Sequence, residues 1–127
     1  MPKSILIVDD SDLIRRALRR MIEASDQFVV CGEAVNGKEA IDQAAKLRPD
    51  LVVLDMSMPE MNGLEAAQVL KKILPTVPLI LYTSHADSVV KEQAQAIGFH
   101  AVVPKDTGGE VILVHARNLL GVGASQL

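Results

Sequence analysis

Polar side chains follow four apolar stretches of this chain, at the point where each stretch ends. Asp9 and Asp10 follow the first apolar run, Asp55 follows the third, Thr83 closes the fourth and Lys105 follows the fifth. An unbroken apolar run is typical of a strand buried on both faces of a parallel sheet. The carboxyl ends of such strands meet at one edge, where open α/β sheets bind their ligands. We therefore expect these five side chains to lie close together.

Three carboxylates at one sheet edge repel one another and need a counter-charge. At about 4 Å and an effective dielectric near 20, each pair costs about 4 kcal/mol. A divalent cation, a lysine, or both would offset this cost. Carboxylate oxygens suit Mg²⁺, which keeps several waters and accepts phosphoryl oxygens as further ligands. The pattern therefore favours phosphate chemistry with Mg²⁺.

The same residues could act directly on phosphorus. An aspartate carboxylate can be the nucleophile and form an aspartyl phosphate. Lys105 would neutralise one carboxylate and hold a phosphate oxygen, while Thr83 offers its hydroxyl to another. Metal and lysine together would stabilise the charge on the transferring group.

The composition limits the class of protein. The 127 residues suit one domain, and 49% hydrophobic with 23% charged residues is typical of a globular chain. Aromatic residues make up only 2%, so the core must be aliphatic, and the net charge of -3 gives no electrostatic case for nucleic-acid binding. Cys31 alone forms no internal disulfide, which favours a reducing compartment. With no signal-peptide pattern and no membrane-length apolar run, we expect a cytoplasmic protein without membrane association.

Strands and helices alternate five times along the chain, with short connections. This pattern predicts an α/β fold with a parallel sheet and helices on both faces. The expected strands cover residues 4–8, 28–34 (at a sheet edge), 51–54, 78–83 and 101–104. The expected helices lie after residue 10, between Asn36 and Pro49, over 63–74 and 87–97, and from a Thr107–Glu110 capping box onward.

The first predicted helix has an apolar face and a basic face. Its apolar residues recur at helical spacing and are Leu13, Ile14, Ala17, Leu18, Met21 and Ile22. The arginines expected opposite them are Arg15, Arg16, Arg19 and Arg20. A solvated face is the ordinary interpretation of such a pattern. A docking surface for a kinase is the alternative, since this helix flanks the acidic pocket.

The last two helices differ in their apolar content. The helix over 87–97 has the weakest apolar pattern, and Gly98 is expected to end it. The fifth helix carries more apolar residues than one buried face needs, which indicates either core packing or an interaction surface. These residues are Val111, Ile112, Leu113, Val114, Leu119 and Leu120.

Over nearly its whole length the sequence resembles the receiver domain of bacterial two-component response regulators, of the chemotaxis-regulator-like kind. The matching residues, in order, are Asp9-Asp10, Asp55, Met58-Pro59, Gly63, Thr83 and Lys105. The resemblance implies a flavodoxin-like, doubly wound, five-stranded parallel sheet in the order 2-1-3-4-5. We expect residues 1–121 to form the receiver domain and 122–127 to be a C-terminal tail or linker stub.

The resemblance also implies a site and its partners. Asp55 would be the phosphoacceptor, and a sensor histidine kinase or a histidine phosphotransfer protein would be the donor. Mg²⁺ would be bound by Asp10, Asp55 and the backbone carbonyl of Ser57, with Asp9 acting through water. The protein would be a phosphorelay switch that catalyses only its own phosphorylation and dephosphorylation.

The resemblance assigns the remaining roles to residues around the acceptor. Thr83 and Lys105 would bind the phosphoryl group, and Ser57 and His85 would tune dephosphorylation. Val102 occupies the switch position that is often aromatic in the family. Its short side chain predicts a signal carried by backbone shifts, read out on the fourth helix, fifth strand and fifth helix. That surface would bind an output partner or a second copy.

The chain also differs from many members of the family at the position after Lys105, where those members have proline. Here Asp106 follows, so no cis peptide bond is expected.

Three other functions are alternatives to the switch. An aspartate-nucleophile phosphohydrolase would have an acid two residues after the nucleophile, where this chain has Ser57. A flavin-binding protein of the same fold would have to hold phosphate beside three carboxylates without metal. A phosphorylation-independent interaction module usually lacks one of the key residues, and this chain has them all.

Overall fold

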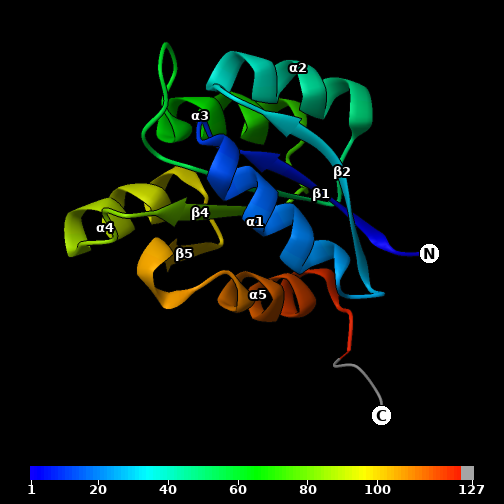
Figure 1. The fold of residues 1–127 in the computed structure, drawn as a ribbon. Helices are drawn as coiled ribbons and strands as arrows, with labels where there is room; N and C mark the ends of the chain where they lie inside the picture. The colour runs from blue at the N-terminus through cyan, green and yellow to red at the C-terminus, as the bar shows by residue number, and fades with distance from the viewer. Residues whose placement is uncertain (124–127) are drawn as a thin grey trace.

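The computed structural model describes residues 1–123 and contains a parallel sheet of five strands in the order β2-β1-β3-β4-β5 (Figure 1). This is the predicted order, and β2 lies at an edge as expected. The strands are β1 (Lys3–Val8), β2 (Phe28–Ala34), β3 (Leu51–Leu54), β4 (Leu79–Thr83) and β5 (Ala101–Pro104). The helices are α1 (Asp12–Glu23), α2 (Gly37–Leu47), α3 (Gly63–Ile73), α4 (Ser88–Ile97) and α5 (Glu110–Leu120), with a 3₁₀ turn at Lys105–Thr107.

The sheet separates two apolar layers. Helices α1 and α5 pack on one face, and α2, α3 and α4 pack on the other (Figure 1). Side chains alternate along each strand, so Leu6 and Val8 face α2–α4 while Ile5 and Ile7 face α1 and α5. This explains the unbroken apolar runs, because both faces of the central strands are buried.

The strand register brings the polar residues to one edge. Val8 is paired with Leu54, Leu54 with Leu81, and Thr83 with Pro104. The residues that follow β1, β3 and β5 therefore emerge side by side with the end of β4. The ladder continues one step past β3, where the Asp55 backbone N–H donates to the Val8 carbonyl at 2.8 Å.

Side-chain caps begin four of the five α-helices. Ser11 caps α1 by accepting from Ile14 N at 3.2 Å, which leaves Asp9 and Asp10 available to the acidic pocket. Asn36, Asn62 and Asp87 cap α2, α3 and α4 in the same way. Gly98 ends α4 in the left-handed conformation at φ 118°, as predicted.

The predicted capping box of α5 is wrong. The helix begins at Glu110 with Gly109 as its N-cap and has no side-chain cap. Thr107 belongs to the preceding 3₁₀ turn, where its hydroxyl donates to the Pro104 carbonyl at 2.8 Å. The sequence spacing matched that of a capping box, but the Thr107 hydroxyl is hydrogen-bonded within the 3₁₀ turn and does not cap α5.

Two further expectations concern the surface and the chain end. Leu13 was expected on the buried face of α1, yet it is 76% exposed. Of the predicted tail, residues 124–127 lie outside the described residues. Within residues 1–123, no helix combines the length and the apolar character needed to cross a membrane.

Candidate functional site

Three aspartates gather at the carboxyl edge of the sheet. One carboxylate oxygen from each of Asp9, Asp10 and Asp55 lies within 4.8 Å of the others. Asp9 and Asp55 are buried, with 1% and 6% of their surface exposed, while Asp10 is exposed to solvent. The cluster therefore has two buried carboxylates and one that faces water.

Lys105 bridges the two buried carboxylates. Its Nζ lies 2.9 Å from Asp9 Oδ2 and 3.0 Å from Asp55 Oδ1. The ammonium group also lies 5.7 Å from the centre of the Tyr82 ring, within the range of a cation–π contact. Lys105 begins the 3₁₀ turn that immediately follows β5. The end of this strand therefore fixes the position from which the Lys105 side chain reaches the two carboxylates.

Burial and charge shift the titration of both partners. Burial raises the pKa of Asp55, the neighbouring Asp9 carboxylate raises it further, and Lys105 only partly opposes this. For Lys105, burial alone would lower the pKa, but hydrogen bonds to Asp9 and Asp55 outweigh burial and raise it. The lysine is therefore held in its charged form between two acids.

The backbone around Asp9 is fixed by the start of α1. Ser11 N donates to Asp9 Oδ1 at 2.9 Å, and Arg15 Nη1 donates to the Asp9 carbonyl at 2.8 Å. Arg15 was predicted on a solvated face, and this is wrong because its side chain is only 12% exposed. Its Nε also bonds Glu33 Oε1 at 2.9 Å, which ties α1 to β2.

Glu33 receives a second arginine as well. Arg19 Nε donates to Glu33 Oε2 at 2.7 Å, so each carboxylate oxygen accepts from one guanidinium. Burial alone would raise the pKa of Glu33, but the hydrogen bonds from Arg19 and Arg15 outweigh burial and lower it. Two of the four predicted surface arginines are thus used to hold α1 against β2. The kinase-docking role predicted for this face stays a prediction, carried by the exposed Arg16 and Arg20.

The loop after Asp55 depends on a close backbone approach. Gly63 N donates to the Met56 carbonyl at 2.9 Å. A Cβ on Gly63 would collide with the Asp55 carbonyl oxygen. Asn62 and Glu65 form a complete capping box just beside it. Together these contacts fix the loop that follows Asp55.

The remaining predicted site residues surround this centre. Thr83 is buried at 1% exposure, and its Oγ1 accepts from His85 N at 3.0 Å. The His85 side chain is exposed. Ser57 is exposed and lines, with Asp10, a surface hollow of about 460 Å³ that reaches α4. Val102 is half-buried, is paired with Leu81, and packs against the α2–α4 layer.

Three contacting residues were missed by the sequence analysis. Arg15 and Glu33 gave no motif, because their contact links positions 18 residues apart on a helix and a strand. Tyr82 was treated only as a strand residue. Its position next to Thr83 was the available signal, since both residues lie at the carboxyl end of β4.

Comparison with known proteins places this chain in a family. Residues 5–117 match the family model described as the response regulator receiver domain. The chain belongs to this family. A receiver domain is a phosphoacceptor signalling switch of two-component systems, so the predicted function class is confirmed at that level.

Individual relatives support the same assignment. The chain is 40% identical over 108 residues to the transcriptional regulatory protein YdfI of Bacillus subtilis, covering 85% of this chain and 50% of that protein. It is 41% identical over 97 residues to a protein-glutamate methylesterase/protein-glutamine glutaminase of Methanococcoides burtonii, covering 76% and 27% respectively. The chain thus spans half or less of the length of these curated relatives.

A solved structure confirms the fold. The response regulator domain of Thermotoga maritima CheB superposes with a TM-score of 0.90 at 27% identity, covering 98% of this chain and 100% of that chain. The flavodoxin-like prediction is therefore confirmed.

The donor set of this receiver domain fits a hydrated magnesium ion. Three carboxylates against one lysine leave two excess negative charges, which one divalent cation would balance. The exposed side of Asp10 offers room for the waters that Mg²⁺ retains. Receiver domains generally bind Mg²⁺, and the residues present here suit it.

Proposed function

We propose that this receiver domain accepts a phosphoryl group on Asp55 from the phosphohistidine of a sensor histidine kinase or a histidine phosphotransfer protein. The observation that carries the proposal is Lys105, which joins the buried Asp9 and Asp55 beside the exposed Asp10. This arrangement prepares one carboxylate as a nucleophile and supplies charge for the group that arrives.

The residues assign the steps of the transfer. Lys105 binds Oδ1 of Asp55, which leaves Oδ2 for attack on phosphorus. The new bond is Asp55 O–P, the bond that breaks is the donor's P–N bond, and the imidazole nitrogen keeps the electron pair and takes a proton. The Thr83 hydroxyl and the Lys105 ammonium then hold phosphoryl oxygens.

Asp10, Asp55 and the Ser57 carbonyl would hold Mg²⁺, with Asp9 acting through water. When bound, the ion would neutralise charge on the carboxylates and on the transferring group. The protein's own contribution is to hold Asp9 and Asp55 close together around Lys105, with Asp9 oriented by Ser11 and Arg15.

The conformational change that carries the signal would start at Thr83. Its hydroxyl oxygen now accepts from His85 N at 3.0 Å. Turning that hydroxyl toward a phosphoryl oxygen would weaken this bond and release residues 84–88, which lead into α4. Helix α4 buries only Val90 and Ala94, so its displacement should cost little. Val102 is too short to take the role of an aromatic switch, and we propose that α4, β5 and α5 together bind the output partner.

The same proposal excludes wider activities for this segment. We propose that it catalyses only its own phosphorylation and dephosphorylation, since the position two residues after Asp55 holds Ser57 in place of the acid of a phosphohydrolase. We also propose that this domain works in the cytoplasm and binds no nucleic acid itself, in keeping with its net charge of -3.

Phosphorylation by a small donor tests the proposal. The protein is incubated with acetyl phosphate and Mg²⁺, and its intact mass is measured before and after hydroxylamine treatment. We expect one phosphoryl group that hydroxylamine removes, and none with Asp55→Asn or with a chelator. Asp42→Asn on the exposed side of α2 is the matched control and should label like wild type.

Other results would favour the alternatives. Turnover of the donor without a phosphorylated protein would indicate a hydrolase. An unchanged mass under all conditions would indicate an interaction module that works without phosphorylation.

The output face has its own test. Amide shifts should change across residues 84–88, α4 and α5 when beryllofluoride and Mg²⁺ are added. Changes confined to the Asp55 pocket would overturn the proposed path.

A further inference from the structure

Tyr82 lies beside the phosphoacceptor in the sheet. Leu54 of β3 pairs with Leu81 of β4. One residue further along each strand, Asp55 and Tyr82 are therefore neighbours. Side chains alternate along a strand, so Tyr82 continues the face that α1 and α5 cover, where it is only 6% exposed. The ring is thus buried next to the place where phosphoryl transfer is proposed.

Lys105 reaches the aspartates from the far side of this ring. Tyr82 pairs with Val103 of β5, and Lys105 follows two residues later. In the sheet order, β4 lies between β5 and the two strands that end at Asp9 and Asp55. The Lys105 side chain must therefore cross β4 to bring its ammonium group within 2.9 and 3.0 Å of the two carboxylates. Its Nζ then lies over the Tyr82 ring, 5.7 Å from the ring centre.

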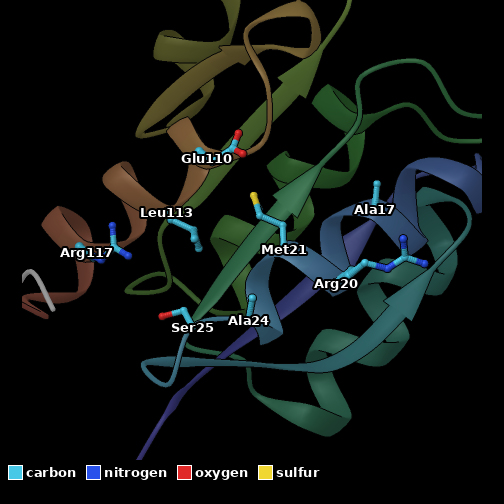
Figure 2. A pocket seen from close by; sticks show the side chains of 8 residues that line it. All are labelled: Ala17, Arg20, Met21, Ala24, Ser25, Glu110, Leu113 and Arg117. Carbon is cyan, nitrogen blue, oxygen red and sulfur yellow. The ribbon is translucent and has the colours of Figure 1, made fainter.

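Core packing explains this ring incompletely. Helices α1 and α5 leave a groove of about 660 Å³ between them, and its walls include Met21 and Leu113 (Figure 2). A smaller hollow of about 220 Å³, also lined by Met21, reaches Tyr82. Packed side chains therefore do not enclose the ring on every side, and its contact with Lys105 is a second interaction to account for.

The position of the ring is notable because aromatic residues are scarce in this chain. The sequence has one tyrosine, two phenylalanines and no tryptophan. Phe28 begins β2, and Phe99 lies two residues before β5, so both are at the amino end of the parallel sheet. Tyr82 lies at the carboxyl end, where the aspartates gather.

The ring supplies Lys105 with a third contact of a different kind. A lysine ammonium is a compact charge on a flexible stem, so two carboxylates attract it without fixing the path of the stem. The face of an aromatic ring is negative and attracts a cation within about 6 Å. Burial raises the pKa of Tyr82, so the phenol is neutral near pH 7. A neutral ring can hold the lysine without competing for the proton of its ammonium group.

We propose that Tyr82 is a positioning residue for phosphoryl transfer, whose ring holds the Lys105 ammonium group beside Asp55 in readiness for a phosphoryl oxygen. This inference rests on the proposed phosphorylation of Asp55. The ring acts through its negative face, so phenylalanine should replace tyrosine at this position and an aliphatic residue should not.

Fluorinated rings test the negative face while nearly keeping the shape of the side chain. Phenylalanine and its 4-fluoro, 3,5-difluoro and 3,4,5-trifluoro analogues are placed at position 82. The rate of phosphorylation by acetyl phosphate and Mg²⁺ is followed by intact mass. Tyr82→Phe should react within about twofold of wild type. The rate should then fall with each fluorine, by about three- to tenfold in all, and Tyr82→Leu should match the trifluoro variant.

The control is the same trifluoro ring in place of Phe28, which is buried in the same apolar layer at the other end of the sheet. This variant should react like wild type. Thermal melting confirms that each variant is folded. Equal rates across the fluorinated series at position 82 would overturn the proposal, because a packing role depends on the size of the ring and not on the charge of its face.

A second measurement needs neither metal nor phosphodonor. Proton NMR of the Lys105 ε-methylene group in the free protein should show signals shifted upfield by the ring. They should stay upfield in Tyr82→Phe and move downfield in Tyr82→Leu. Unchanged signals in Tyr82→Leu would overturn the contact. A wild type that takes no phosphoryl group, while these signals move as expected, would instead refute the proposed function and leave the contact between Lys105 and Tyr82 standing.

Discussion

Replacing Asp10 by asparagine should stabilise the metal-free protein and remove most of the stabilisation that Mg²⁺ provides. One carboxylate oxygen of Asp10 lies within 4.8 Å of one carboxylate oxygen of each of Asp9 and Asp55. The Asp10→Asn change would keep the shape of the side chain and remove its charge. The variant therefore changes the charge repulsion within the cluster while leaving the packing of the loop the same.

The size of the effect follows from Coulomb's law. At 4.8 Å, one like-charge pair costs about 0.9 kcal/mol in water and about 3.5 kcal/mol at an effective dielectric of 20. Asp10 is exposed, so the water value is closer for both of its pairs. Lys105 bridges Asp9 and Asp55 and makes no ion pair with Asp10, so the lost attraction is small. We expect a net gain of about 1 kcal/mol, or a rise of about 3–5 °C in Tm for a domain of this size.

Thermal melting with a chelator and with a Mg²⁺ titration is the assay. Without metal the variant should melt above wild type. With saturating Mg²⁺ the order should reverse, because only wild type retains the anionic ligand and so gains the full stabilisation from binding. Asp42→Asn on α2 controls for the loss of a surface charge. Equal Mg²⁺ stabilisation of wild type and variant, or destabilisation of the metal-free variant, would refute the proposed metal site.

Three further predictions test other parts of the structure. Glu33→Gln should destabilise the protein by about 1 kcal/mol near neutral pH. Because the folded-state pKa of Glu33 lies below its ordinary value of 4.5, the stability difference between wild type and variant should be full above pH 4.5 and fade as the pH falls below it. Urea melts in which this stability difference does not depend on pH would contradict the two-arginine contact. Gly63→Ala should cost about 2 kcal/mol or more through collision with the Asp55 carbonyl, whereas Gly123→Ala, where a Cβ meets open space, should melt like wild type. His85→Ala and Ser57→Ala should each change the decay rate of the phosphorylated protein without changing Tm, and decay rates equal to that of wild type would exclude both from the path of the attacking water.

The architecture followed from simple patterns in the sequence. Two-sided burial made the three central strands, β1, β3 and β4, largely apolar runs, and short connections between alternating elements left a parallel sheet as the expected arrangement. Asp9, Asp55 and Lys105 could be placed together for the same reason, since each follows a strand whose end is aligned with its neighbours.

Contacts between elements distant in the sequence were harder to foresee. Arg15 looked like one of four surface arginines, and only the packing of α1 beside β2 shows that it binds Glu33 and the Asp9 carbonyl. Thr107 matched a capping box by spacing, but the local hydrogen bond to Pro104 ends the turn before α5 begins. Helical periodicity assigned Leu13 to the core, but this residue lies in the first turn of α1 and is 76% exposed.

Identification of the phosphorylated residue tests the central claim most directly. The protein is phosphorylated with acetyl phosphate and Mg²⁺, reduced with borohydride so that an aspartyl phosphate becomes homoserine, and digested for peptide mass mapping. The account predicts homoserine at position 55 and unmodified aspartate at positions 9 and 10. Homoserine at either of those positions, with Asp55 unmodified, would contradict it.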